Sequence, residues 1–414
     1  MRRRTLIGLF AVFGLLAAVV VAGVGFSGGG LTETWVSETP RENEINHHAV
    51  GVGPAGEVVV APVAEVPNTE VPITDTSCAL VRLAPETGET RWRIGMPAAD
   101  CYTHALTEPA IGDIDGDGAL EVVVSSTENA LIAYSADDTS EEWRVSLPTY
   151  GYGRPTVGNV TPAAGPEVVT SDIEGNVVVV NGDGTVAWRA ALNGSQSGPS
   201  VWRAPLVDDL DADGDPEVLI ASNKGPVVFS AGGEIEWAPG GAANYLAAAQ
   251  IDDTEATAVF STGRDTVRAH TVGGELLWER DLPNSRFRVA SDADADGAVE
   301  LYVGQLGGQL RALSATTGET EWSTRLATGD VRVQPPVVGD VDGDGNSEVV
   351  VALETGTVVV VDPESGTERA RYERGVPVWT APSLADIDGD GAEEILVRYG
   401  DGRVVRLDAP QQAS

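Results

Sequence analysis

The chain has 414 residues, which is enough for a large core and for one to three domains. Its 63 acidic residues outnumber its 26 basic ones, and the formal net charge is -37 at pH 7. A surface of this charge repels nucleic acid and anionic lipid, which argues against a DNA- or RNA-binding role. Acidity this strong is typical of halophilic proteins, because concentrated salt shortens the Debye length to about 3 Å and screens the self-repulsion.

Residues 1–30 have the pattern of an export segment. Three arginines follow Met1, and an uncharged apolar run extends from Leu6 to Phe26 before a Gly-rich stretch. A helix of that length spans about 30 Å, the thickness of the hydrocarbon core of a bilayer. The arginines belong on the cytoplasmic side, so the rest of the chain lies outside. We expect a single-pass transmembrane anchor with a Gly-rich linker; a cleaved signal peptide, and hence a secreted protein, is the alternative.

The next segments are a short strand with Trp35 at residues 31–36 and a degraded copy, at residues 49–92, of the repeat described below. Cys78 and Cys101 are the only cysteines, and in an exported protein they most simply form a disulfide. Two small buried residues are the alternative. A metal site at the cysteines is not expected, because no histidine lies at ligand spacing; the histidines are His47, His48, His104 and His270.

From residue 109 onward the sequence repeats one unit. The first position of an Asp-rich loop recurs every 40 to 50 residues, at Asp113, Asn159, Asp209, Asp252, Asp292, Asp340 and Asp386. An aromatic residue near the end of each unit keeps the same spacing, at Trp92, Trp143, Trp188, Trp237, Trp278, Trp322 and Tyr372. Two markers in phase indicate an array of one supersecondary unit.

Each unit holds four short apolar runs bounded by Gly, Asp, Asn and Pro, a pattern typical of strands. Four strands per unit of about 45 residues predict an all-β β-propeller of four-stranded blades. The last unit has only three strands, and residues 31–36 can supply the fourth, which closes the ring without a free edge. We expect eight blades over residues 31–410 and a tail at 411–414; seven blades are the alternative if the first copy is irregular.

Five loops keep three aspartates at alternate positions, then glycine, then glutamate. The candidate calcium ligands are Asp113, Asp115, Asp117, Glu121, Asp209, Asp211, Asp213, Glu217, Asp292, Asp294, Asp296, Glu300, Asp340, Asp342, Asp344, Glu348, Asp386, Asp388, Asp390 and Glu394. Calcium takes six to eight hard oxygen ligands, which alternate positions of a tight loop can direct at one centre. The glycine permits the sharp turn. The early glutamate and the strand that follows distinguish these loops from EF-hands.

The alternative for these loops is a set of solvated acidic turns, in which the glutamate packs at the start of the strand. Three copies, at residues 51–56, 159–165 and 252–255, lack the ligands but keep the strand pattern. Calcium is therefore expected to be structural and to stiffen loops without defining the fold. The repeated tryptophans are expected to pack between blades; a stacking platform for a quinone or a sugar is the alternative.

The repeat resembles two families. The stretch from Asp340 to Val351, with its order Asp-Val-Asp-Gly-Asp-Gly and Glu-Val-Val-Val, resembles the FG-GAP/VCBS-type propeller repeat of integrin heads and microbial surface proteins. Residues 311–322, which end in Gly-Glu-Thr-Glu-Trp, resemble the pyrroloquinoline-quinone-type repeat. This second resemblance implies an eight-bladed ring like that of the quinoprotein alcohol dehydrogenases and of BamB-type assembly lipoproteins. Both resemblances imply the fold more strongly than a function.

Function is the least determined property. Asn159 and Asn193 begin N-glycosylation sequons. The calcium loops are spread around the ring, the cysteines are not vicinal as in the quinoprotein alcohol dehydrogenases, and no Ser-His-Asp or zinc constellation is visible. The sequence therefore favours a non-catalytic, monomeric scaffold at the cell surface that binds an unidentified protein or envelope component, with no quinone. A quinoprotein-like dehydrogenase with its cofactor in the central funnel is the alternative.

Overall fold

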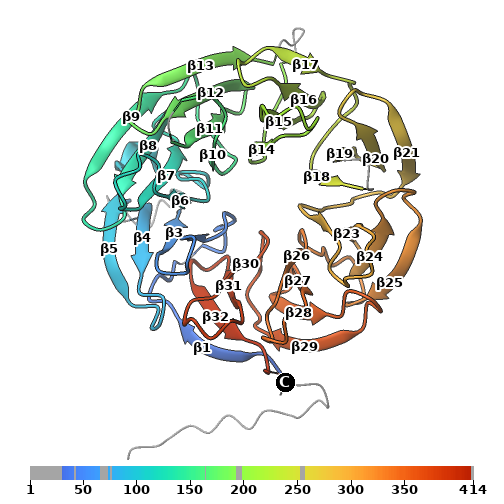
Figure 1. Cartoon of the computed structure of the whole chain (residues 1–414). Helices are drawn as coiled ribbons and strands as arrows, with labels where there is room; N and C mark the ends of the chain where they lie inside the picture. Colours follow the sequence, from blue (N-terminus) through green and yellow to red (C-terminus); the bar gives the residue numbers. More distant parts are fainter. Residues whose placement is uncertain are drawn as a thin grey trace, which may run out of the picture.

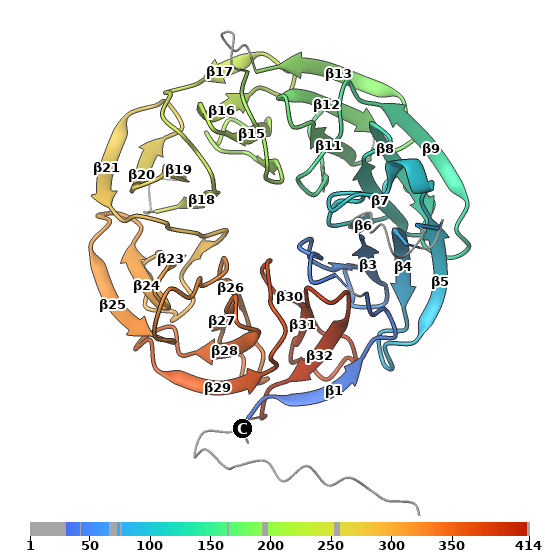
Figure 2. The same cartoon turned by 180° about the vertical axis from the view of Figure 1, so that it is seen from behind.

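The computed structural model describes residues 30–411 apart from 42, 66–72, 75–76, 164, 193–197 and 252–256. These residues form eight separate four-stranded antiparallel sheets arranged as blades around a central axis (Figures 1 and 2). The expected all-β, eight-bladed propeller is confirmed, and the seven-bladed alternative is wrong, because the degraded first copy forms a complete sheet of its own. We number the blades 1 to 8 in chain order.

Each blade runs from a first strand at the axis to a fourth strand at the rim. The first strands have two to five residues: β2 (Gly51–Val52), β6 (Ala110–Gly112), β10 (Thr156–Gly158), β14 (Leu206–Asp208), β18 (Leu246–Gln250), β22 (Ala290–Ser291), β26 (Val337–Gly339) and β30 (Ser383–Ala385). The second strands are β3 (Val59–Val63), β7 (Glu121–Ser126), β11 (Glu167–Ser171), β15 (Glu217–Ser222), β19 (Thr257–Thr262), β23 (Glu300–Gly304), β27 (Glu348–Ala352) and β31 (Glu394–Arg398).

The third strands lie farther from the axis and are β4 (Ala79–Leu83), β8 (Ala130–Ser135), β12 (Asn176–Asn181), β16 (Gly225–Phe229), β20 (Thr266–Thr271), β24 (Gln309–Ser314), β28 (Thr357–Val361) and β32 (Val404–Asp408). The fourth strands are β5 (Thr90–Gly95), β9 (Glu141–Ser146), β13 (Val186–Ala191), β17 (Ile235–Trp237), β21 (Leu276–Asp281), β25 (Thr320–Arg325), β29 (Glu368–Glu373) and β1 (Thr32–Val36). The fourth strands are partly exposed, whereas the second and third are buried almost throughout.

The ring is closed by its two ends. Strand β1 is antiparallel to β32, with Thr32 opposite Asp408 and Val36 opposite Val405. Figure 1 shows this junction, where the blue first strand lies along the red last blade. Residues 31–36 thus supply the strand that the last unit lacks, as expected, and no sheet edge is left open at the junction.

The core consists of β-branched runs packed between neighbouring blades. Buried clusters combine the second and third strands of one blade with those of the next; Val123 and Val178, for example, belong to one cluster. Tryptophans fasten the rim, since the indole Nε1 of Trp143 donates to the carbonyl of Gly182 in the next blade at 2.8 Å. Equivalent bonds from blade to blade are made by Trp35, Trp92, Trp188, Trp278 and Trp322. The inter-blade role expected for these residues is confirmed.

Blade 7 departs from the pattern at its aromatic marker. Ala370, opposite Val360, occupies the ladder position that Trp322 holds opposite Ala312 in blade 6. Tyr372 lies two residues farther along, and its hydroxyl donates to Glu33 of the closing strand β1. The sequence spacing therefore aligned Tyr372 with the wrong position, although it still fastens one blade to the next.

The export segment, Asn193 and the loop at Asp252 lie outside the described residues. Within the described part of the chain, no helix is long and apolar enough to span a membrane. The single helical turn there is the 3-10 helix η1 (Ala98–Asp100).

Candidate functional site

The repeat assigns different residues to the two faces of the ring. In each blade the connection from the preceding fourth strand enters the first strand on one face, and the loop to the second strand, which is Asp-rich in five blades, leaves it on the other. Because the first strands are short and run alongside the axis, the two kinds of loop are separated by the thickness of the ring. The entry connections therefore form one candidate site, and the Asp-rich loops form a second, on the opposite face.

The entry connections surround a cavity of about 650 Å³ at the axis. All eight connections contribute to its lining, which includes Glu44, His47, His48, His104, Glu108, Tyr152, Arg154, Trp202, Arg203, Tyr245, Arg286, Arg288, Arg332, Gln334 and Trp379. Five arginines and two carboxylates in one cavity make it a basic site in a protein whose net charge is -37. A basic, aromatic-lined cavity of this size suits a carboxylate- or phosphate-bearing ligand.

Hydrogen bonds and stacking hold several of these arginines in place. Arg286 Nη1 donates to Gln334 Oε1 at 2.8 Å, and burial lowers the pKa of Arg286. The Arg203 guanidinium lies 4.0 Å from the centre of the Tyr245 ring. Glu108 Oε1 lies 3.5 Å from Arg154 Nη1 and 3.9 Å from Arg288 Nη2. Arg203 and Arg286 are therefore held in place by the protein itself, which limits the entropy lost when a ligand binds to them.

The cavity also brings together three of the four histidines. His47 and His48 precede β2, and His104 lies in the connection from β5 to β6. Nitrogens of these three rings lie within 4.8 Å of one another. Spacing along the chain did not reveal this group, because residues 47 and 104 meet only where the entry connections of blades 1 and 2 lie side by side.

The Asp-rich loop of blade 2 shows how the sequence forms the opposite site. Asp113 Oδ1 accepts from the amide of Gly116 at 2.8 Å, and its Oδ2 accepts from that of Gly118 at 3.1 Å. Gly118 has a φ of 90°, a left-handed conformation that glycine adopts without strain. Oxygens of Asp113, Asp115 and Glu121 lie within 4.8 Å of one another. The loop therefore gathers three hard oxygens, which are of the ligand type that calcium takes.

Matching groups occur in other blades. In blade 4 oxygens of Asp209, Asp211 and Glu217 converge, whereas in blades 6 and 7 the three loop aspartates converge. The backbone pattern also recurs in blades 4, 6, 7 and 8, where the first aspartate accepts from the glycine five residues later. All five loops expected from the sequence thus adopt one conformation.

The loop glutamate has a structural role of its own. Glu121 Oε2 accepts from the amide of Ile114 at 2.8 Å, and Glu217 bonds Leu210 in the same way. Blade 3 lacks the aspartates, yet its Glu167 makes the equivalent bond to Val160. The glutamate therefore fixes the start of the second strand through one oxygen. Its second oxygen remains for a cation, for a neighbouring hydroxyl or for an arginine.

Burial beside aspartates raises the pKa of these glutamates. The pKa of Glu121 and Glu217 rises to about 7 and that of Glu300 to about 8, first through desolvation and then through neighbouring carboxylates. Glu300 is 1% exposed, and its Oε1 has no hydrogen-bond partner among the described residues. A divalent cation would satisfy that oxygen and remove the repulsion.

A bulge in the fourth strand supplies one further charged residue beside the loops of blades 2, 4, 6 and 7, and sequence spacing did not reveal it. In blades 2, 4 and 6 the bulged residue is Glu142, Glu236 or Glu321. Burial, and then the aspartates of the adjacent loop, raise the pKa of each of these glutamates. These three blades therefore add a carboxylate to the loop, which strengthens the case for a cation.

In blades 7 and 8 an arginine enters the acidic group instead. The bulged residue of blade 7 is Arg369, whose Nη1 lies 2.7 Å from Glu348 Oε1 and 3.5 Å from Asp342 Oδ2. In blade 8 the Nη2 of Arg406 lies 2.6 Å from Asp388 Oδ2 and 3.0 Å from Glu394 Oε1. A guanidinium thus provides, within the chain, part of the positive charge that blades 2, 4 and 6 lack.

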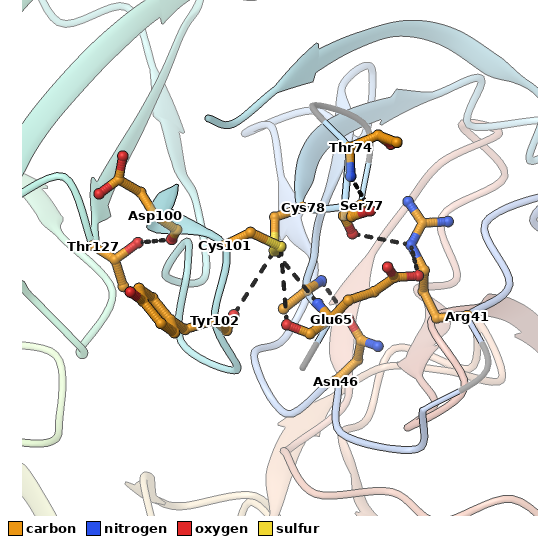
Figure 3. Close-up of a disulfide and its surroundings, with 11 residues drawn as sticks. Arg41, Asn46, Glu65, Thr74, Ser77, Cys78, Asp100, Cys101, Tyr102 and Thr127 are labelled. Carbon is orange, nitrogen blue, oxygen red and sulfur yellow. Dashed lines mark hydrogen bonds and ion pairs between the residues drawn. A yellow bond between two sulfur atoms is a disulfide. The ribbon is translucent and has the colours of Figure 1, made fainter. Parts of the chain in front are cut away.

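Cys78 and Cys101 form a disulfide with a Cα–Cα distance of 5.4 Å. It links the residue before β4 to the connection that carries His104, as Figure 3 shows. The Thr127 hydroxyl donates to the carbonyl of Asp100, which ties this connection to blade 2 as well. The disulfide therefore positions one wall of the cavity.

Of the two sequon asparagines, Asn159 is exposed at the end of β10. The hydroxyl of its sequon threonine, Thr161, donates to Glu167 Oε1.

The sequence repeat did not reveal the cavity residues, because its most visible marker lies in the loops that follow the first strands. The cavity residues lie in the connections that precede those strands. The sequence nevertheless contains a second pattern that indicates the cavity. Arginine or another polar residue stands shortly before many first strands, as in Arg154-Pro155, Arg203-Ala204-Pro205 and Gln334-Pro335-Pro336. Alignment of those positions around a ring would have predicted a basic centre.

Comparisons with known proteins agree with the ring. Residues 50–259 and 263–411 match the family described as outer membrane protein assembly factor BamB. No curated protein sequence matches the chain. Among solved structures, BamB from Moraxella catarrhalis is 14% identical with a TM-score of 0.59, over 91% of this chain and 99% of that one.

Two other similar structures differ in origin. The quinohemoprotein alcohol dehydrogenase from Comamonas testosteroni is 13% identical with a TM-score of 0.65, over 93% of this chain and 77% of that one. The computationally designed Ika8 protein is 16% identical with a TM-score of 0.62, over 91% and 99%. At these identities the structural matches show the fold alone. The family match covers most of the ring, and the chain belongs to the family described as outer membrane protein assembly factor BamB.

Proposed function

We propose that this chain is an extracytoplasmic, calcium-bearing propeller that acts as a non-catalytic scaffold and binds a partner in its basic central cavity. The observation that carries the proposal is the charge contrast. Five arginines line one cavity of about 650 Å³ in a chain of net charge -37. An acidic surface repels acidic molecules in general, whereas the fixed guanidinium groups at the axis attract a carboxylate-rich segment that fits between them.

Calcium has a supporting role in this proposal. The Asp-rich loops lie on the face opposite the cavity, so calcium there stiffens the scaffold without contacting the partner. The glutamates that carry a raised pKa, and the unpartnered oxygen of Glu300, support a cation in blades 2, 4 and 6. We propose that blades 7 and 8 bind calcium more weakly, because Arg369 and Arg406 already approach their carboxylates.

The location is proposed from the sequence of the first thirty residues. We propose that residues 1–30 anchor the chain in the cell membrane, with the ring outside the cell in a medium of high salt concentration. A cleaved signal is the alternative. Mass spectrometry of the N-terminus of the purified protein distinguishes them, because a chain that begins near residue 30 contradicts the anchor.

A charge-reversal experiment tests the cavity as the binding site. The full chain and an Arg203→Glu/Arg286→Glu variant are cross-linked in envelope extracts, with Arg189→Glu on the rim strand β13 as the matched control. A protein or envelope component that is captured by the wild type and the control, and lost in the double variant, supports the proposal. Equal capture by all three chains contradicts it.

A quinoprotein-like dehydrogenase is the second candidate, because the cavity combines arginines with Trp202 and Trp379. The remaining residues fit a quinone cofactor poorly. Among the described lining residues the carboxylates are Glu44 and Glu108, Glu108 faces two arginines, and no aspartate is present to act as a base beside calcium. Stoichiometric retention of pyrroloquinoline quinone with alcohol-dependent dye reduction would overturn the non-catalytic proposal.

A further inference from the structure

Three histidine side chains from two different blade connections meet at the wall of the central cavity. His47 Nε2 lies 2.7 Å from His104 Nδ1, and the nitrogens of His47, His48 and His104 all lie within 4.8 Å of one another. Tyr152 covers the group, with its ring centre 4.8 Å from that of His104 and 4.9 Å from that of His48. The imidazoles are therefore packed as a cluster and do not point separately into solvent.

The backbone fixes the tautomer of one ring. His47 Nδ1 lies 2.6 Å from the carbonyl oxygen of Ile45. A carbonyl can only accept, so in the neutral ring Nδ1 carries the proton and Nε2 has a lone pair that faces His104. A carbonyl that holds the second nitrogen in this way is the usual outer partner of a metal-binding histidine.

His48 lacks the partner that a buried imidazole needs. The residue is 9% exposed, and its Nε2 has no hydrogen-bond partner among the described residues. A histidine cluster held only by hydrogen bonds would leave this buried atom unsatisfied, which is unfavourable.

The disulfide limits the movement of the third ligand. Cys101 is joined to Cys78 beside β4 (Figure 3) and lies three residues before His104, so both sides of the cluster are fastened to blade 1. Such fastening lowers the entropy lost when three ligands are brought to one ion.

We propose that His47, His48 and His104 form a binding site for a divalent transition-metal ion of the zinc class, with its remaining coordination position open to the basic cavity. Imidazole ligands select zinc, copper or nickel and not calcium. Zinc–nitrogen bonds are about 2.0–2.1 Å long, so tetrahedral ligation needs the His47 and His104 nitrogens to separate slightly, to about 3.4 Å. An anionic group held by the cavity arginines could then reach the open position.

The test uses the tag-free full chain in mild detergent, with millimolar calcium present to occupy the acidic loops. Zinc is titrated by calorimetry, and cobalt is added separately because its visible spectrum reports nitrogen ligation. One zinc per chain and a tetrahedral cobalt spectrum are expected. His104→Gln should weaken zinc binding by about 100-fold or more and abolish the spectrum.

His270→Gln is the matched control, because His270 is the remaining histidine and lies in β20 against Trp237, outside the cluster. It should bind zinc like the wild type. If His104→Gln does not fold, as judged by far-UV circular dichroism, His47→Gln replaces it with the same expectation. Absence of zinc binding in the wild type, or wild-type affinity in a folded cluster variant, would overturn the proposal.

Discussion

Blades 2, 4, 6, 7 and 8 each have an acidic loop of the same type. Blades 2, 4 and 6 differ from blades 7 and 8 in the residue that lies beside this loop. At the bulge of the fourth strand the first group has Glu142, Glu236 or Glu321, whereas blade 7 has Arg369. Blade 8 reaches the same balance from its third strand, through Arg406. We propose that the loop aspartates alone do not specify calcium. In this proposal, one residue on another strand of the blade decides whether the loop needs an external cation or is balanced by an arginine of the same chain.

The largest effect expected from this comparison is on the thermal stability of the whole ring. Three cations bound at about one hundred times their dissociation constant contribute about 8 kcal/mol, which corresponds to a melting temperature raised on the order of 10 °C. Chelation should remove this increment while the far-UV circular dichroism at room temperature keeps its β signature. A melting temperature that does not change on addition of chelator would contradict the proposal of structural calcium.

The second-largest effect on stability is expected when the arginine beside an acidic loop is removed. Arg369→Ala leaves Glu348, which is fully buried, beside Asp342 without its guanidinium, at a cost of about 3–5 kcal/mol in chelator. Calcium should recover most of that loss, because it can replace the arginine. The control is Arg371→Ala on the same strand, whose surface pair with Glu368 is worth at most about 1 kcal/mol. Equal losses in the two variants, by denaturant unfolding, would contradict the comparison.

The disulfide offers a third measurement, independent of calcium. Replacement of Cys78 and Cys101 by serine should lower the free energy of unfolding by about 3 kcal/mol, since the bond closes a loop of 23 residues in the unfolded chain. Because the bond lies away from the acidic loops, the loss should be the same with calcium and with chelator. If the loss of unfolding free energy differs between calcium and chelator, the two faces of the ring are coupled, which contradicts this prediction.

The smallest effect concerns backbone strain inside the loops. Ala212 and Ala295 have φ values of 60° and 59° at positions where blades 2, 7 and 8 have glycine. Ala212→Gly should stabilise the chelated protein by about 0.5–1 kcal/mol, because glycine adopts this conformation without strain. Calcium-saturated protein should gain less, since the ion already holds the loop. Destabilisation in chelator would show that the loop relaxes to another conformation.

The sequence was sufficient for the ring and insufficient for the cavity, for a physical reason. Blade count, strand order and the closing strand at Trp35 follow from local periodicity, which is repeated and therefore visible in the chain. The pairing of Arg369 with Glu348 depends on a bulge that displaces one residue, and no spacing rule predicts it. His47 and His104 meet because two successive entry connections converge on the axis, a contact that appears only after the ring is built.

The most direct measurement is the number of calcium ions that bind tightly to the wild-type chain and to two exchange variants, by equilibrium dialysis with elemental analysis. We predict three ions in the wild type, two in Glu142→Arg and four in Arg369→Glu, with Glu141→Arg, at the neighbouring exposed position, still at three. Five equivalent ions in the wild type, or a number that neither exchange alters, would contradict the claim that the neighbouring strand decides which loops bind calcium.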